Sequence, residues 1–194
     1  MSDIGQKRLN EALSALSELL GAADASAHLV VIGGSGLIAI EAVSRTTQDV
    51  DVVALEEAGV LVSADPLPPP VVTAAATVER DLGLAPGWLN SGPTSLLKLG
   101  LPSGFIDRLI RRDYGPALRV SFAARIDQIF FKLYAAADRR EPRDFTDLRL
   151  LVPTPAELQH AAHWVRTHNM PGPFDDDLAR ALRDLGVEDD GRAA

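Results

Sequence analysis

Cysteine is absent from the sequence, and aromatic residues make up only 5% of it. Without cysteine the chain can form no disulfide, no thiolate metal site and no cysteine nucleophile. A long hydrophobic run is also missing, because glycines interrupt the longest apolar segment at residues 33–36 and leave it short of the ~20 residues that a membrane helix needs. The sequence also has no charged leader followed by an apolar core. We therefore expect a soluble, cytoplasmic protein with no membrane partner.

Basic residues are fewer than acidic residues: the sequence has 19 lysines and arginines and 27 aspartates and glutamates, so its formal net charge is -8. This balance argues against a protein that coats nucleic acid, because neutralisation of phosphates supplies most of that binding. The basic residues are unevenly distributed, and more than half of them lie between Lys98 and Arg149. A local surface that faces phosphate is therefore compatible with the acidic total.

At 194 residues and 46% hydrophobic, the chain is long and apolar enough to bury a proper core. Apolar spacing, β-branched runs and breaker residues predict helices and strands in alternation over the first part of the chain: a helix over 4–20, a strand over 28–32, a helix over 35–44, a strand over 49–55 and a helix over 71–82. Two further strands, 105–110 and 117–122, are expected to form a hairpin through Tyr114-Gly115-Pro116.

From residue 123 onward the apolar spacing is helical. It predicts four helices, over 123–139, 143–151, 155–168 and 174–185. We therefore predict an α/β (α+β) fold in which a small mixed sheet is flanked by helices. The α/β core is expected over residues 1–122, and a helical C-terminal part that completes the functional site over residues 123–194.

Residues 28–57 can be interpreted in two incompatible ways. In the first, Gly34-x-Gly36-x-x-Ala39 follows a strand and opens a helix as in a dinucleotide-binding fingerprint, with Glu56 near the position of a ribose-binding acid. A doubly wound sheet of that kind requires nearly continuous apolar strands, because helices cover both of its faces. Carboxylates interrupt the second strand here, so this is the less favoured interpretation.

In the second interpretation, the important feature is the pair Asp49 and Asp51. Side chains at i and i+2 of a strand point to the same face, with Cα atoms roughly 6.5 to 7 Å apart. Like charges this close favour a hard cation such as Mg²⁺ or Mn²⁺, which bridges carboxylates to the phosphates of a nucleotide. The glycines before the next helix allow backbone amides to approach those phosphates. The alternative is that Asp49 caps a turn and Asp51 is solvated.

The motif Gly33-Gly34-Ser35, followed after 13 residues by Asp49-Val50-Asp51, resembles the signature of the polymerase-beta-like nucleotidyltransferase superfamily. The fuller pattern over 44–51, together with Lys132 and the segment 143–148, is similar to a bacterial branch that contains the AbiEii-type abortive-infection toxins. Trp88-Leu89-Asn90 is similar to a segment of uncharacterised relatives in that branch. The resemblance covers roughly residues 28 to 150.

The resemblance implies a nucleotidyltransferase-like fold and a reaction in which an acceptor hydroxyl attacks the α-phosphate of a nucleoside triphosphate. Gly33, Gly34 and Ser35 are then expected to hold the triphosphate, and Asp49 and Asp51 to bind Mg²⁺ or Mn²⁺ and take part in catalysis. The acceptor stays open between a small molecule, a protein and a transfer-RNA end. A cognate antitoxin is a possible partner by the same resemblance.

Lys132 matches a functional lysine of the toxin branch and is expected to be catalytic or nucleotide-binding, with a solvated lysine as the alternative. Arg45 either contacts phosphate or only holds the loop before Asp49. Asp144 and Asp147 share a helix face at i and i+3, so they either complete the site or pair with arginines at 140 and 143.

Many members of the superfamily carry a third catalytic acid on a later strand, and residues 117–122 contain none. Asp107 is one candidate for this role, and the pair Asp144 and Asp147 is another. If none of them reaches the metal, the protein is a non-catalytic module that binds a nucleotide or a partner protein.

Overall fold

The computed structural model describes residues 3–168 and 173–188. The chain divides into two compact units, Met1–Ala124 and Arg125–Ala194, and each is described by itself. Within these described ranges, no helix combines the length and the apolar character that crossing a membrane requires.

The first unit contains a mixed sheet and the helices that flank it, as predicted. Its elements in chain order are α1 (Gln6–Ala22), β1 (Ala27–Ile32), α2 (Gly33–Ala39), β2 (Val50–Glu57), β3 (Val60–Val62), α3 (Pro69–Leu82), β4 (Leu89–Asn90), the 3-10 turn η1 (Gly92–Thr94), α4 (Ser95–Leu99), α5 (Phe105–Arg108), β5 (Ile110–Asp113) and β6 (Leu118–Phe122).

The strands lie in the order β3-β2-β1-β6-β5, and β4 pairs with β2 outside this path. Strand β1 is central: it runs antiparallel to β2 and parallel to β6. Its last four residues are buried, as expected for a strand with neighbours on both sides. The antiparallel pairing of β1 with β2 makes the dinucleotide interpretation wrong, because that fingerprint belongs to a parallel strand-helix-strand unit.

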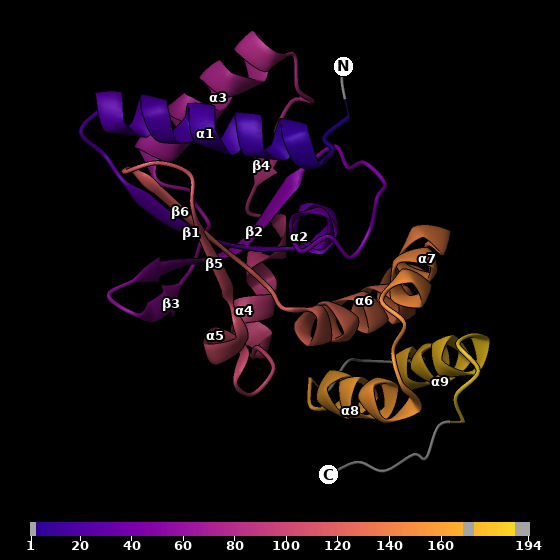
Figure 1. Cartoon of the computed structure of the whole chain (residues 1–194). Coiled ribbons are helices and arrows are strands. Elements are labelled where there is room, and N and C mark those ends of the chain that lie inside the picture. Colours follow the sequence, from indigo (N-terminus) through magenta and orange to yellow (C-terminus); the bar gives the residue numbers. More distant parts are fainter. Residues whose placement is uncertain (1–2, 169–172, 189–194) are drawn as a thin grey trace. The chain divides into compact units, whose positions relative to one another are not determined.

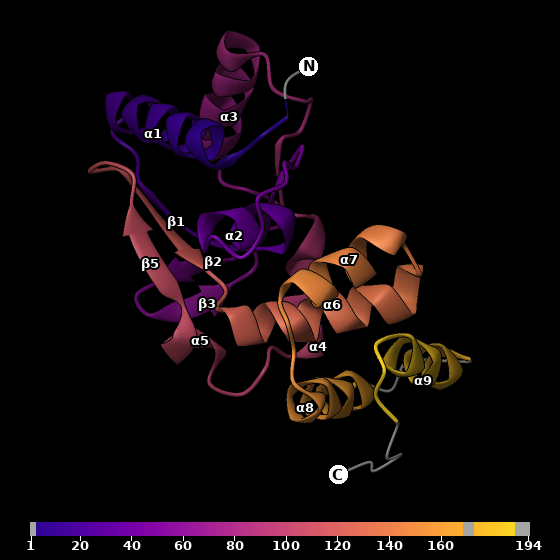
Figure 2. The same ribbon diagram turned by 45° about the vertical axis from the view of Figure 1, so that its right-hand side comes forward.

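Helices α1 and α3 lie side by side against this sheet (Figures 1 and 2). Four of the five leucines of α1 recur every three or four residues, so they share one face of the helix, and each is fully buried: Leu9, Leu13, Leu16 and Leu20. Helix α3 contributes small residues to its own buried face, including Ala74 and Ala75. The predicted amphipathic first helix is thereby confirmed.

The strand expected over 105–110, which carried Asp107, is wrong. Residues 105–108 form helix α5, and the strand begins only at Ile110. Gly104 precedes the helix with φ +73°. Phe105 and Leu109 are both buried whereas Ile106 is 39% exposed, so the buried positions follow the four-residue spacing of a helical turn. Strand β5 also lacks apolar alternation, because it is a charged strand at the edge of the sheet.

The second unit is helical, as predicted. It contains α6 (Arg125–Arg139), α7 (Pro142–Leu150), α8 (Pro155–Arg166) and α9 (Phe174–Asp184). An aromatic cluster joins these helices, in which Trp164 on α8 packs against Phe130 and Phe131 on α6 with ring centroids 5.7 and 5.8 Å apart. Aromatic pairs at such distances add to the stabilisation that burial alone provides.

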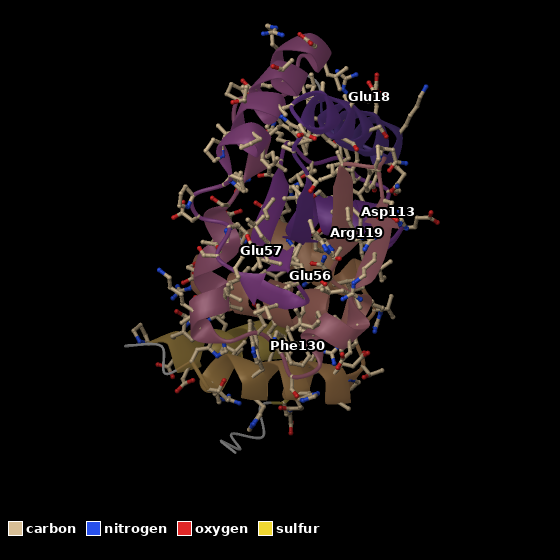
Figure 3. The ribbon with its side chains drawn as sticks, turned by 90° about the vertical axis from the view of Figure 1, so that its left-hand side faces the viewer. Glu18, Glu56, Glu57, Asp113, Arg119 and Phe130 are labelled. Atoms are coloured by element: carbon tan, nitrogen blue, oxygen red, sulfur yellow. The ribbon has the colours of Figure 1, made fainter. Side chains whose placement is uncertain are left out.

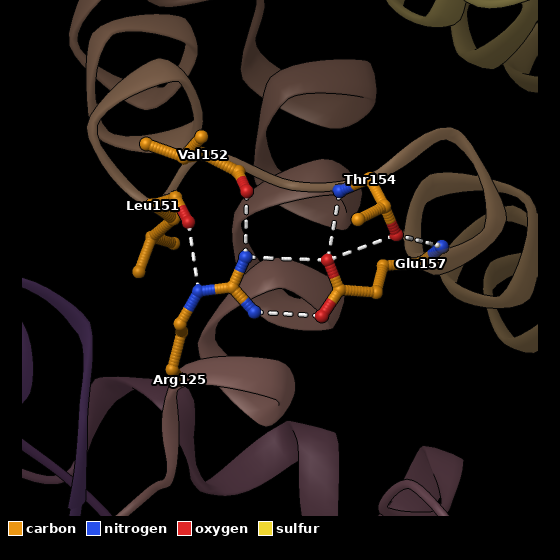
Figure 4. A network of polar contacts seen from close by, with 5 residues as sticks. All are labelled: Arg125, Leu151, Val152, Thr154 and Glu157. Atoms are coloured by element: carbon orange, nitrogen blue, oxygen red, sulfur yellow. Dashed lines mark hydrogen bonds and ion pairs between the residues drawn. The ribbon is translucent and has the colours of Figure 1, made fainter.

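A polar network fixes the start of α6 against the connection between α7 and α8 (Figure 4). Arg125 donates from Nε to the Leu151 carbonyl at 2.8 Å and from Nη2 to the Val152 carbonyl at 2.7 Å. Its Nη1 donates to Glu157 Oε1 at 2.6 Å, and Glu157 also forms a capping box with Thr154 at the start of α8. The Arg125 hydrogen bond holds the pKa of Glu157 at about 2, below its ordinary value of 4.5.

Candidate functional site

The sheet topology brings the two halves of the Gly-Gly-Ser and Asp-x-Asp motif together at one end of β1. Gly33 follows β1 directly, and Asp49 immediately precedes β2. Because β2 runs antiparallel to β1, its first residues lie beside the last residues of β1, and Asp51 is opposite Ile32 in the register. Residues 13 positions or more apart in the sequence thus become neighbours.

Gly33 is in direct contact with the Asp51 side chain. Its backbone has φ +71°, a conformation that side chains other than glycine adopt only under strain. A Cβ atom added to Gly33 would also lie 2.7 Å from Asp51 Oδ2, inside the range of any normal contact. The backbone conformation therefore requires glycine at position 33, and the position of Asp51 independently leaves no space for a side chain there.

Gly34 is in similarly close contact with the loop before Asp49. A Cβ atom on Gly34 would lie 2.8 Å from Thr47 Oγ1 and 3.3 Å from Arg45 Nη2. Thr47 Oγ1 donates a hydrogen bond to Asp49 Oδ1 at 2.9 Å. This bond links Asp49 to Gly33–Ser35, the first turn of α2, which we call the glycine turn. Arg45 Nη1 donates to the Thr46 carbonyl at 2.8 Å. Arg45 therefore holds the loop and at the same time presents its guanidinium group beside Gly34.

Ser35 contributes a buried hydroxyl group to the same turn. The residue is fully buried, and its Oγ has no hydrogen-bond partner among the described residues. Buried hydroxyl groups are almost always hydrogen-bonded, so this atom is an unusual feature of the turn. A phosphate oxygen is an acceptor that the Ser35 hydroxyl could bind.

Asp49 and Asp51 are both half-buried, and each is oriented by a neighbouring donor that the sequence did not predict as a site residue. Thr47 donates to Asp49, and Asn90 Nδ2 donates to Asp51 Oδ1 at 3.2 Å. The motif Trp88-Leu89-Asn90 was the signal that could have identified Asn90, but nothing in the sequence places it next to Asp51.

This donor set fits a small divalent cation. Mg²⁺ usually keeps several waters and is held by one or two carboxylates together with substrate phosphates. The Asp51 carboxylate lies against Gly33, and Thr47, which borders Gly34, hydrogen-bonds the Asp49 carboxylate. The buried Ser35 hydroxyl lies in the same turn. Among the described residues there is no group of three or more histidine, aspartate or glutamate side chains that could hold a metal ion.

Lys132, Asp144 and Asp147 belong to the second unit, where they form a buried ion cluster. Lys132 Nζ lies 2.8 Å from Asp144 Oδ1 and 2.7 Å from Asp147 Oδ2. The Lys132 side chain is only 9% exposed, so the alternative of a solvated lysine is wrong. Arg139 also pairs with Asp144, at 3.0 Å. The spacing of the two aspartates by three residues on α7 is what presents both to a single ammonium group.

Asp107 is the candidate for a third acid that lies in the first unit. Strand β6, which pairs with β1, carries no carboxylate within Leu118–Phe122. Asp107 is exposed and lies on helix α5. The role that the sequence analysis assigned to Asp107, Asp144 or Asp147 stays a prediction.

The opposite end of the same strands borders a cavity of about 380 Å³. Its lining includes His28 at the start of β1, Glu56 and Glu57 at the end of β2, and Arg119 on β6, three of which are labelled in Figure 3. His28 Nε2 lies 2.7 Å from Ser121 Oγ, and burial lowers the pKa of His28. This cavity is therefore separate from the end of the sheet at which Gly33 meets Asp51.

Comparison with protein families gives one match over most of the chain. The model of a family described as "Nucleotidyltransferase of unknown function (DUF6036)" matches residues 7–151. These residues include the Gly33–Ser35 turn, the Asp49–Asp51 pair and the Lys132 cluster. No curated protein sequence matches the chain.

Proposed function

The chain belongs to this family of nucleotidyltransferases, and on that premise we propose that it transfers a nucleoside monophosphate from a nucleoside triphosphate to an acceptor hydroxyl in a metal-dependent reaction. The observation that carries the proposal is the close approach of Asp51 to Gly33, which brings a carboxylate to a turn suited to phosphate. The Ser35 hydroxyl, which has no hydrogen-bond partner within the described part of the chain, and the guanidinium of Arg45 support the same interpretation.

Each residue has a distinct task in the proposed reaction. Gly33 and Gly34 would bind the triphosphate through their backbone amides, while their missing side chains leave room for Asp51 and Thr47. Ser35 would donate a hydrogen bond to the triphosphate. Asp49 and Asp51 would hold Mg²⁺ or Mn²⁺, an ion that neutralises charge on the phosphates and on the leaving group. Arg45 adds positive charge beside the turn, which favours binding of an anion.

The chemical step is an in-line displacement at phosphorus. The acceptor oxygen forms a bond to the α-phosphorus while the bond from that phosphorus to the bridging oxygen of the β-phosphate breaks. Pyrophosphate leaves with the bonding electrons, and the hydroxyl proton passes to solvent. Positioning and electrostatic stabilisation account for most of the catalysis in such reactions, so the orientation of Asp49 and Asp51 is decisive.

A non-catalytic nucleotide-binding module is the second candidate. It is favoured by the lack of a carboxylate on β6, the strand that neighbours β1. In this case the glycine turn and the Asp49–Asp51 pair bind a metal-nucleotide complex without transferring it. The same site supports both candidates, and only turnover separates them.

A role as the toxin of a toxin–antitoxin pair extends the first candidate, and it rests on the resemblance of the motifs alone. The net charge of -8 makes a small-molecule or protein hydroxyl at least as suitable an acceptor as a transfer-RNA end. Growth arrest on expression in bacteria, lost with Asp51→Asn, is the outcome expected for a toxin.

The experiment that tests the proposal uses wild type, Asp51→Asn and the control Asp81→Asn, which changes an exposed aspartate on α3. Each protein is incubated with each of the four α-labelled nucleoside triphosphates, Mg²⁺ or Mn²⁺, and cellular RNA, protein and metabolite pools in turn. We expect label in one pool with wild type and Asp81→Asn, and none with Asp51→Asn. Binding of a triphosphate without labelling of any pool supports the second candidate, and the absence of any metal-nucleotide binding refutes both.

A further inference from the structure

Strand β4 is only two residues long, yet its position is tightly fixed. It pairs in parallel with the start of β2, so that Leu89 is opposite Val50 and Asn90 is opposite Asp51. The preceding residue, Trp88, is 1% exposed and donates from Nε1 to the Ala75 carbonyl on α3 at 3.0 Å. The Trp88 carbonyl accepts the backbone N–H of Val50. Contacts with two different elements therefore hold β4 beside β2.

The Asn90 side chain makes two hydrogen bonds whose directions are mutually consistent. Its Oδ1 accepts the backbone N–H of Gly92 at 2.9 Å, and its Nδ2 donates to Asp51 Oδ1 at 3.2 Å. A backbone N–H can only donate, so the amide oxygen must face Gly92 and the amide nitrogen must face the carboxylate. The amide group is thereby fixed in the orientation that presents a donor to Asp51.

Asp51 is consequently restrained on both of its oxygens. Asn90 holds Oδ1, while Oδ2 lies against Gly33, where an added Cβ would be 2.7 Å away. The amide is a neutral donor, so it leaves the charge of the Asp51 carboxylate uncompensated and available to a cation. The hydrogen bond from Asn90 also limits the rotation of the Asp51 side chain. A metal ligand without such a restraint loses this rotational freedom only when the metal binds.

We propose that Asn90 is a positioning residue that holds the Asp51 carboxylate in the orientation required for binding the metal-nucleotide complex. This inference rests on the proposed function of the Gly33–Asp51 site. Asn90 acts through Asp51, because the group that it turns toward the carboxylate is its amide nitrogen, while its amide oxygen is turned toward Gly92. Residues that orient metal ligands in this way typically account for about 10- to 100-fold in metal affinity.

The test compares wild type, Asn90→Ala and Trp88→Phe in the full chain. Trp88→Phe is the matched control, because it removes the hydrogen bond to Ala75 and weakens the anchoring of β4 without removing any atom that contacts Asp51. For each protein, calorimetry measures the affinity for MnATP, MnGTP, MnCTP and MnUTP, and urea titration measures the free energy of unfolding.

We expect Asn90→Ala to bind the preferred metal-nucleotide complex about 10- to 100-fold more weakly than wild type, and Trp88→Phe to bind it within about threefold of wild type. Wild-type affinity in Asn90→Ala overturns the positioning role and leaves the proposed function standing. The positioning role is also overturned if Asn90→Ala and Trp88→Phe lose the same affinity and the same free energy of unfolding. Asn90 would then only stabilise the fold. If wild type binds none of the four complexes, the proposed function fails and this inference fails with it.

Discussion

Removing the charge of Glu157 should destabilise the second unit in a manner that depends on pH. Glu157→Gln is a suitable change because glutamine can still serve in a capping box with Thr154, so the substitution mainly removes the charge that pairs with Arg125. The pKa of Glu157 is about 2 in the folded chain, against an ordinary value of 4.5. A pKa depressed by folding means that the charged form stabilises the folded state.

The expected magnitude follows from this pKa and from solvent exposure. The fall of the Glu157 pKa from 4.5 to about 2 limits the contribution of this carboxylate to the free energy of unfolding to roughly 3 kcal/mol, since a pKa difference of one pH unit corresponds to about 1.36 kcal/mol. The Arg125 and Glu157 side chains are 42% and 25% exposed, so solvent screens the pair and the figure must be discounted. We expect Glu157→Gln to lower the free energy of unfolding by about 1–2 kcal/mol at neutral pH.

The pH dependence distinguishes this effect from a general loss of packing. Stabilisation by a carboxylate with a depressed pKa is complete above the unfolded pKa of about 4.5 and disappears as the pH falls toward 2. Urea unfolding of wild type and Glu157→Gln at several pH values should therefore show a difference that narrows below about pH 4.5. Glu141→Gln, an exposed change at the start of α7, is the matched control and should differ little from wild type. A difference between wild type and Glu157→Gln that stays constant down to pH 3 would refute the reasoning.

Two further substitutions test the ion cluster and the glycine turn. Lys132→Met leaves Asp144 and Asp147 buried without their shared ammonium group, so it should lower the free energy of unfolding by about 3–5 kcal/mol. A loss below about 1 kcal/mol in urea titration would contradict this prediction. Gly33→Ala should lower the melting temperature and reduce the free energy of unfolding by about 1–3 kcal/mol, because alanine is strained at φ +71° and its Cβ would displace Asp51. An unchanged melting temperature would contradict the described contact.

The sequence predicted the parts of this molecule whose patterns are local. Helix α1 and the helices of the second unit follow from regular apolar spacing, and the glycine turn follows from a strand that stops at Gly33. The pair Asp49 and Asp51 was predicted to face one way from a strand, but β2 begins only at Val50, so this shared direction stays a prediction. The position of Asp51 next to the turn required knowledge of the strand pairing. The predictions of the helices and of the glycine turn each needed information from a segment of at most about 20 residues.

The features that sequence reasoning missed depend on contacts between distant segments. Asn90 reaches Asp51 only because β4 inserts beside β2, a pairing between residues 39 positions apart that no periodicity reveals. Strand β5 was misplaced because Arg111 and Arg112 give it the composition of a surface loop. The sequence analysis assigned Lys132 a functional role, but it did not pair Lys132 with Asp144 and Asp147, which α7 brings to it. Long-range pairing and charge compensation are tertiary properties, and both override local propensity.

The pairing of β1 with β2 contains one irregularity, close to the contact between Gly33 and Asp51. The pairing of β1 with β2 shifts register between Val30 and Val31, because Val30 is opposite Ala54 whereas Val31 is opposite Val52. Val53 is therefore an extra residue in β2, a β-bulge of the kind that often redirects side chains next to active sites. If the register continued unchanged, Ile32 would face Val52, and Asp51 would face Gly33. The bulge thus pairs Asp51 with Ile32, the last residue of β1, and in this position the Asp51 carboxylate lies against Gly33, the residue that follows.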